Sequence, residues 1–427
     1  MRRRRRFGPI VAGLAIVLLS APALAEVIFL STQLRPIEEA EAMRQEILKG
    51  FQGEVDFIPE MEGPFTSRII AEAEAGEGSV GLIGGQHGDM SPLLQEGALD
   101  PVDDVMQAIE DRGFVESFVE LGKLGGDEQY YVPWMQATYI MAANKQALEH
   151  LPDGADVNSL TYQQLIQWAA NIEQATGKRL LGFPAGPQGL MHRFFQGYLY
   201  PSYTGGVVRP YKSAAAVQMW QDFKELWAHV NPRSTGFAFM QEPLLAGEVW
   251  IAWDHTARLL EALRQRPDDF VAFPVPAGPE GRGYMPVVAG LAIPRTSPDR
   301  AAAVELIEYL TEPEVQVTTL QQVGFYPVVE AELPQDLDEG IRLAGAAIQA
   351  QASAPDAVPS LLPVGLGDAA RELNKVFLDS FQRIVIRGQE VQAALDTEAG
   401  NLARIVEGAG AACWPPDAPS DGPCPVE

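Results

Sequence analysis

The stretch that decides the fold is residues 27–85, VIFLSTQLRPIEEAEAMRQEILKGFQGEVDFIPEMEGPFTSRIIAEAEAGEGSVGLIGG. Three short apolar runs in it are predicted to be strands, at residues 27–30, 55–60 and 79–85. Between them, Pro36 and the glutamates after it begin one helix, and residues 65–76 form a second. This strand–helix order predicts an open α/β sheet with parallel strands.

Polar residues follow the first and third predicted strands. Ligands of open α/β sheets bind outside the carboxyl ends of the strands, where the loops gather. The segments STQLR (residues 31–35) and GGQHGD (residues 84–89) should therefore lie on one rim. We expect Gln33, Arg35, Gln86 and His87 to be ligand-binding residues there.

The first 25 residues have the three parts of a secretory signal peptide. MRRRRR is basic, FGPIVAGLAIVLLS is a short apolar core, and APALA ends in the small residues that signal peptidase reads. We expect export and cleavage after about Ala25, with the general and twin-arginine routes both open. The apolar core is too short to span a bilayer comfortably, and no later segment is apolar for long enough.

The mature chain that would remain is strongly acidic. Without the five leader arginines it has 26 basic and 57 acidic residues. Nucleic acids and anionic membrane surfaces need basic patches, so this balance argues against both as partners. Solubility explains the acidity better than an acidic binding face does. A mature chain of about 400 residues is long enough for two domains.

The only two cysteines lie in the C-terminal tail. Cys413 and Cys424 bracket the proline-rich run WPPDAPSDGP. In an exported protein this spacing favours a disulfide that closes a small loop. A metal-binding pair is disfavoured, because no histidine or further cysteine lies nearby.

Recognisable enzyme motifs are missing from the sequence. GLIGGQHG has the wrong glycine spacing for a dinucleotide site, and there is no phosphate-binding loop, nucleophile elbow or zinc motif. Two of the five histidines, His150 and His229, fall on predicted helix surfaces. A pair of glycosidase carboxylates stays open only because acidic residues are abundant. We therefore predict no catalytic residue, no metal and no cofactor.

Residues 287–328, VVAGLAIPRTSPDRAAAVELIEYLTEPEVQVTTLQQVGFYPV, carry a family resemblance. They resemble a signature in the C-terminal half of the extracellular solute-binding proteins of ABC transporters, family 1. These are the carbohydrate-binding kind that includes maltose-binding protein. The matching features are a G-x-x-I-P strand (290–294), an S-P pair (297–298), an L-T-x-P-E-x-Q turn (310–316) and a G-x-x-P loop (324–327).

Three further stretches resemble the same family, in the right order. YYVPWMQATYIMAANKQALEHL (130–151) is similar to the crossing from the first lobe to the second, although Ala143 replaces a tyrosine. GEVWIAWDHTARL (247–259) is similar to a strand and loop, but it lacks the family's final glycine. IVIRGQEVQAALDTEAGNLARIV (384–406) is similar to the closing helix pair.

The resemblance implies an α/β, two-lobed periplasmic binding protein fold. Each lobe would be an open, mostly parallel sheet flanked by helices, with hinge crossings and a helical C-terminal region. We expect the segments to be a signal peptide (1–25), an N-terminal lobe (26–136 and 285–335), a C-terminal lobe (137–284 and 336–408) and a disulfide-bonded tail (409–427).

The resemblance also directs attention to the cleft between the lobes. A sugar site needs rings to stack on and short polar groups for the hydroxyls. Beyond the rim residues above, we expect ligand contacts where loops follow strands or cross between lobes. These are Trp134, Gln136, Gln188, His192, Trp253, Asp254, His255, Phe325 and Tyr326, with backbone groups from Ala289 and Gly290. Trp250 is expected in the core.

The function implied is capture without chemistry. The protein would be a periplasmic, monomeric binding protein that delivers a sugar, oligosaccharide, polyol or glycoside to an inner-membrane ABC permease. An alternative is an anionic solute, such as a glycerol phosphate or sulfonated sugar, held by Arg35, His87 or His255. A secreted glycosidase is a remote third reading.

Overall fold

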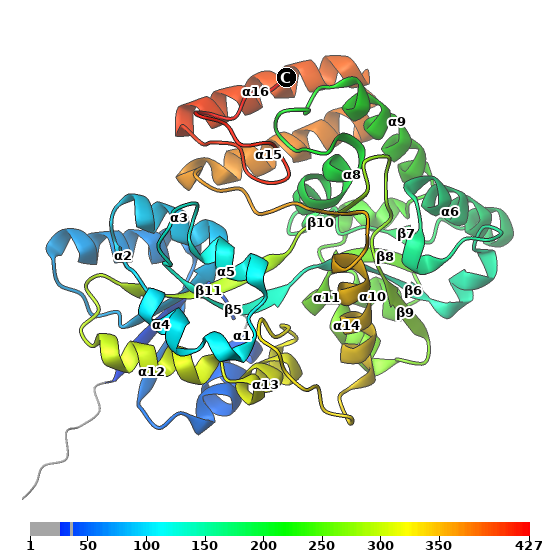
Figure 1. Ribbon diagram of the computed structural model, residues 1–427. Coiled ribbons are helices and arrows are strands. Elements are labelled where there is room, and N and C mark those ends of the chain that lie inside the picture. The colour runs from blue at the N-terminus through cyan, green and yellow to red at the C-terminus, as the bar shows by residue number, and fades with distance from the viewer. Residues whose placement is uncertain (1–25, 35–36) are drawn as a thin grey trace, which may run out of the picture.

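The computed structural model describes residues 26–34 and 37–427, and shows two α/β lobes side by side (Figure 1). The N-terminal lobe contains a six-stranded sheet. Its strands, in spatial order, are β2 (Val55–Pro59), β1 (Val27–Ser31), β3 (Leu82–Gln86), β11 (Val287–Pro294) and β4 (Leu99–Asp100), with β5 (Val132–Ala137) also paired to β11. The three strands and two helices predicted within residues 27–85 are all present.

Helices flank this sheet. They are α1 (Ile37–Ala42), α2 (Glu62–Ala75), α3 (His87–Gln95), α4 (Asp103–Ala108), α5 (Glu116–Gly122), α12 (Arg300–Leu310) and α13 (Pro313–Val323). The core on one side includes Phe29, whose ring lies 5.2 Å from that of Phe57 and 5.5 Å from that of Trp134. Burying each such ring contributes roughly 1.5–3 kcal/mol. β1 is a continuous apolar run that is buried along most of its length, as expected for a strand covered on both faces.

The C-terminal lobe is built on a four-stranded sheet. Its spatial order is β7 (Leu181–Gly182), β8 (Ile251–His255), β6 (Tyr139–Asn144) and β9 (Phe270–Phe273). The surrounding helices are α6 (Tyr162–Thr176), α7 (Met191–Phe194), α8 (Tyr200–Thr204), α9 (Ala214–Ala228), α10 (Gln241–Leu245), α11 (Thr256–Gln265) and α14 (Glu339–Ala352). The helical C-terminal region, α15 (Ala370–Phe381) and α16 (Val391–Ala409), packs on this lobe (Figure 1).

The two-lobed fold is confirmed, but the sheets are mixed rather than mostly parallel. In the first sheet the pairs β1–β2 and β1–β3 are parallel, whereas β11 is antiparallel to β3, β4 and β5. In the second, β6 is antiparallel to both β8 and β9. The physical reason is the crossings: β6 and β11 enter their sheets from the other lobe, and so run against their neighbours.

Three chain crossings join the lobes and are hydrogen-bonded to one another. The first lies between β5 and β6, the second between β10 (Arg282–Tyr284) and β11, and the third between α13 and α14. The Thr138 hydroxyl on the first donates to the Met285 carbonyl on the second at 2.8 Å. Gln136 on the first exchanges backbone hydrogen bonds with Tyr326 on the third, at 3.0 and 2.7 Å.

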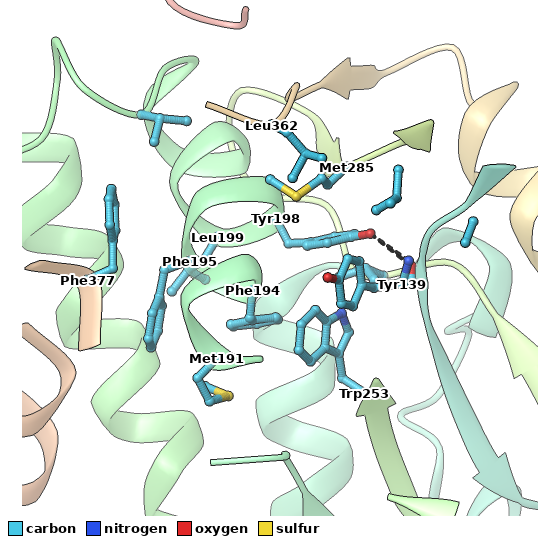
Figure 2. Close-up of a cluster of buried hydrophobic side chains, with 14 of the residues drawn as sticks. Tyr139, Met191, Phe194, Phe195, Tyr198, Leu199, Trp253, Met285, Leu362 and Phe377 are labelled. Carbon is cyan, nitrogen blue, oxygen red and sulfur yellow. Dashed lines mark hydrogen bonds between the residues drawn. The ribbon is translucent and has the colours of Figure 1, made fainter. Parts of the chain in front are cut away.

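An aromatic cluster fills the C-terminal lobe next to the hinge (Figure 2). Trp253 stacks on Tyr139 with 5.0 Å between ring centroids and packs edge-on against Phe194. The Tyr198 hydroxyl accepts from the Tyr139 backbone N–H at 3.0 Å and bonds the Thr138 hydroxyl at 3.0 Å. The hinge is therefore anchored in the best-packed part of this lobe.

The tail carries the predicted disulfide, which joins Cys413 to Cys424. Within the described residues, no helix is both long enough and apolar enough to cross a bilayer.

Candidate functional site

The carboxyl ends of strands from both sheets face the boundary between the lobes. In the first lobe, β5 ends at the hinge, and β1 and β3 run in the same direction because all three are related through β11. In the second, Tyr139 opens β6 directly after the hinge and pairs with His255, the last residue of β8. Loops that follow β1, β3, β7 and β8 therefore meet at one interlobe face, which is the candidate site.

His255 lies at the centre of this face. Its ring meets the Tyr139 ring edge-on at 5.1 Å and lies 6.3 Å from the ring of Phe325, on the third crossing. The Ala257 backbone N–H donates to its Nδ1 at 3.3 Å, so the ring proton sits on Nε2. Burial, and then the charge of Arg258, lower the pKa of His255 to about 3. At neutral pH His255 is an uncharged hydrogen-bond donor.

Asp254 points the opposite way from its neighbour. Its carboxylate is fully buried and accepts the backbone N–H groups of Met240 at 3.0 Å and His255 at 2.8 Å. Burial raises its pKa to about 7, against the lowering effects of Arg258 and these two hydrogen bonds. It bonds the backbone of His255 rather than the imidazole, so the two side chains do not form an acid–base pair.

Trp253 has no exposed surface. A ligand could stack on its ring only after the aromatic cluster rearranged. Its Nε1 is buried without a hydrogen-bond partner. Trp250, expected in the core, is partly buried, packs against the core cluster and stacks on His150 at 6.1 Å. Both tryptophans therefore serve packing in this structure.

Two arginines and an exposed phenylalanine complete the side of the interlobe face that the C-terminal lobe provides, and of these only Arg193 and Phe239 were not considered from the sequence. Arg258, in the first turn of α11, has a side chain 24% exposed and stacks over the ring of Phe239 at 4.5 Å. Phe239 is 43% exposed. Arg193 is the third residue of α7, and its side chain donates a long 3.4 Å hydrogen bond to Gln196. We call Arg193, Arg258 and Phe239 the basic wall.

Of the two residues predicted on the loop after β7 and at the start of α7, His192 lies near the basic wall and Gln188 is exposed to solvent. Burial, followed by the charges of Arg193 and Arg258, holds the pKa of His192 well below its ordinary value. Its Nδ1 is buried without a partner. Gln188 is exposed on the loop that follows β7. Arg258 lies four residues after Asp254, one helical turn on from the strand end, and this spacing alone indicates that the two can pair, as they do at 3.9 Å.

On the N-terminal side, the predicted rim residues are held by their own lobe. Gln33 is buried and donates to the Thr32 hydroxyl. Gln86 caps α3 through a capping box with Asp89. His87 bonds the Tyr131 hydroxyl at 2.9 Å, and burial lowers its pKa to about 4 despite a hydrogen bond with the Leu121 backbone. Arg35 lies outside the described residues.

The remaining predicted positions serve the hinge or the core. Trp134 is fully buried against Phe29. The Gln136 side-chain amide donates to the Pro327 carbonyl at 2.7 Å, and the buried Tyr326 hydroxyl donates to the Ile341 carbonyl. The Gln136 and Tyr326 side chains therefore already have partners at the hinge, whereas Trp134 packs in the core with its Nε1 unpartnered.

Ala289 and Gly290 lie inside the first sheet. Their backbones pair with β3 on one side and, across a shift in register between them, with β5 on the other, so they lie within the sheet and not in a loop. Gly290 is small for a packing reason, because a Cβ there would lie 2.2 Å from the Tyr131 ring. The expected backbone contribution from these two residues therefore finds no support in the geometry.

The lobes approach closely on the α3 side of the interlobe face. A cavity of about 10 Å³ remains between them, lined by His87, Leu121, Pro286, Val288, Leu361 and Leu362. That is room for about one water molecule. Among the residues that the structure describes, no group of three or more His, Cys, Asp or Glu side chains could hold a metal ion.

The fold and the interlobe face define a two-lobed extracellular binding protein. The family model of the bacterial extracellular solute-binding proteins matches residues 38–317, and the chain belongs to that family. No curated protein sequence matches the chain.

Solved structures with the same fold cover both lobes. The maltose-bound MalE3 of T. maritima is 19% identical, with a TM-score of 0.69, and the match covers 88% of this chain and 98% of that one. UgpB from Mycobacterium tuberculosis, in complex with glycerophosphocholine, is 18% identical, with a TM-score of 0.70, covering 89% and 98%. The GacH receptor of Streptomyces glaucescens, solved unliganded and with acarbose, is 18% identical, with a TM-score of 0.67, covering 89% and 97%.

Proposed function

We propose that this protein captures a carbohydrate between its lobes by hinge closure and hands it to an inner-membrane ABC permease from the periplasm. The observation that carries the proposal is the interlobe face, where strand ends of both sheets meet across three crossings, the first of which is hydrogen-bonded to each of the other two. Binding by closure around a ligand needs this arrangement. The maltose-bound and acarbose-bound proteins of the same fold support a sugar as ligand.

The size of the interlobe cavity limits where a ligand can bind. A cavity of about 10 Å³ is far below the roughly 300 Å³ or more that small-molecule sites enclose. This cavity is therefore too small to be the solute site, and a ligand must bind elsewhere on the interlobe face or after the lobes part.

The chemistry of the C-terminal wall suits a neutral hydroxyl ligand. Phe239 has exposed ring area on which a sugar face can stack, worth roughly 1–3 kcal/mol. The uncharged His255 offers an Nε2–H donor. The buried Asp254 is not aligned to take a proton from the imidazole, so we propose binding without catalysis, by a monomer.

An anionic solute is the second candidate, and the basic wall favours it. Arg193 has no carboxylate partner among the described residues, and Arg258 has only Asp254, at 3.9 Å. Two arginines on one wall suit a phosphate or sulfonate. The similar fold solved with glycerophosphocholine is consistent with such a ligand.

Titrations of tryptophan fluorescence with maltose, acarbose and glycerophosphocholine test the two candidates. The variant is Arg258→Gln. Its matched control is Arg233→Gln, which also removes an arginine over a phenylalanine ring, at 5.5 Å from Phe237, but next to Glu248, before the start of β8.

For a neutral sugar, Arg258→Gln should weaken binding by less than about tenfold, because one neutral hydrogen bond is worth about 1 kcal/mol. For the phosphodiester it should weaken binding more than about tenfold, since hydrogen bonds to charged groups are worth about 1.5–3 kcal/mol. Equal losses in both variants would contradict a specific role for Arg258. A response to none of the three solutes would count against both candidates.

A further inference from the structure

The disulfide-closed tail lies behind the segment that forms part of the interlobe wall. We call residues 413–424 the tail loop and residues 360–366 the cleft segment. The cleft segment connects β12 (Ala357–Pro359) to the start of α15 and has no regular secondary structure. Leu361 and Leu362 from it line the interlobe cavity together with His87 and Leu121 of the other lobe.

The cleft segment also touches the N-terminal lobe directly. A Cβ placed on Gly88, in the first turn of α3, would lie 3.3 Å from the Pro363 carbonyl oxygen. The first N–H groups of a helix have no partners within it, so a carbonyl oxygen is well placed there. Leu362 belongs to the same buried cluster as Met285 and Tyr198 at the hinge (Figure 2). This segment therefore lies between the two lobes and contacts both.

The tail loop is hydrogen-bonded to the cleft segment. The Leu361 backbone N–H donates to the Pro415 carbonyl at 3.0 Å. Before it, Ser360 is fixed to the C-terminal lobe by bonds to Tyr284 and Gln196. After it, a Cβ on Gly365 would touch Ala411 at 3.6 Å, in the chain leading into the tail loop.

Asp417 attaches the tail loop to the C-terminal lobe through hydrogen bonds. Its buried carboxylate accepts the backbone N–H groups of Val207, Val208 and Arg209 at 2.8, 2.9 and 2.9 Å. Three convergent N–H groups form a nest for an anion. Trp414, also buried, packs in the core of the same lobe. The disulfide closes the loop between these anchors and Cys424, whose N–H donates to Ala411.

We propose that the tail loop positions the cleft segment, with Asp417 as the positioning residue, and so shapes the ligand wall of the C-terminal lobe. The proposal rests on the proposed function, because the wall matters only if the interlobe face binds a solute. Neither Asp417 nor the disulfide touches that face; both act through Leu361.

Hydrogen–deuterium exchange of the ligand-free, disulfide-bonded protein tests the proposal. The variant Asp417→Asn keeps the size of the side chain but replaces one acceptor of the nest by a donor. Its matched control, Asp421→Asn, makes the same change at an exposed position of the same loop. A second variant, Cys413→Ser with Cys424→Ser, opens the loop without touching the nest.

We expect amides of residues 361–366 to exchange at least about tenfold faster in Asp417→Asn and in the double serine variant, and amides in the first turn of α3 to follow. Asp421→Asn should match the unmodified protein. Unchanged protection of residues 361–366 would overturn the proposal, as would a loss spread evenly over β6 and β8. A change confined to the cleft segment would refute its contact with α3. Because no ligand is used, these outcomes are independent of whether the proposed function fails.

Discussion

Asp254 allows the energetics of the interlobe face to be tested quantitatively. Its carboxyl group has an ordinary pKa of 3.8, which burial raises to about 7. The side chain is completely buried, so solvent does not screen the effect. The gap is about three pH units, and each unit corresponds to 1.36 kcal/mol, so keeping this group ionised costs the folded protein about 4 kcal/mol above pH 7.

The sign of the pH dependence follows from which state loses its proton first. Between about pH 4 and about pH 7 the unfolded chain has released the Asp254 proton while the folded protein still holds it. This carboxyl group therefore makes the protein less stable as the pH rises through that window. His255 and His87 have pKa values lowered to about 3 and about 4, so they destabilise the fold as the pH falls below their ordinary pKa of 6.5.

The perturbation is Asp254→Asn, measured by urea unfolding followed by tryptophan fluorescence at about pH 4.5 and about pH 8. The asparagine loses one backbone hydrogen bond, a constant cost at both pH values. The histidine contributions are common to both proteins and cancel. The difference in the free energy of unfolding, variant minus unmodified protein, should therefore be about 3 kcal/mol larger at about pH 8 than at about pH 4.5. A difference that stays constant to within about 1 kcal/mol would refute the burial argument.

Three further substitutions test the hinge, the cluster and the sheet. Tyr198→Phe leaves the buried Tyr139 N–H without its partner and should cost about 1–3 kcal/mol in urea unfolding; no loss would mean that the hinge bond is replaceable. Trp253→Ala should cost about 3–5 kcal/mol, seen as a lower melting temperature, because the ring is fully packed; a loss of ligand affinity with full stability would instead return Trp253 to the site. Gly290→Ala should cost about 1–3 kcal/mol, because its methyl group meets the Tyr131 ring, and a stable variant would show that the ring can move.

The sequence predicted the lobes well because local patterns and their order determine them. Residues 27–85 have the strand and helix periodicities that the structure displays, and the disulfide follows from an exported chain with two neighbouring cysteines. The strand direction in β6 and β11 could not be predicted from one lobe alone. It depends on where the chain crosses between lobes, which is a long-range property.

The site was harder to predict because both faces of the second sheet are covered. Strand β8 has helices on each side, so alternation does not tell which tryptophan is inside, and Trp253 is the buried one. Gln136 and Trp134 are engaged by Pro327 and Phe29, which are distant in sequence. Arg258 and Phe239 meet only through the packing of α10 and α11, which no local motif reveals.

The melting temperature of the protein, measured across a panel of neutral sugars, oligosaccharides and polyols, tests the central claim most directly. A solute that binds only the folded protein adds about 2.7 kcal/mol when present at about 100 times its dissociation constant. We expect at least one neutral carbohydrate to raise the melting temperature by several degrees, at about 2–4 °C per kcal/mol for lobes of this size. A panel in which no neutral carbohydrate shifts it, while glycerophosphocholine does, would contradict the claim that the interlobe face takes a sugar.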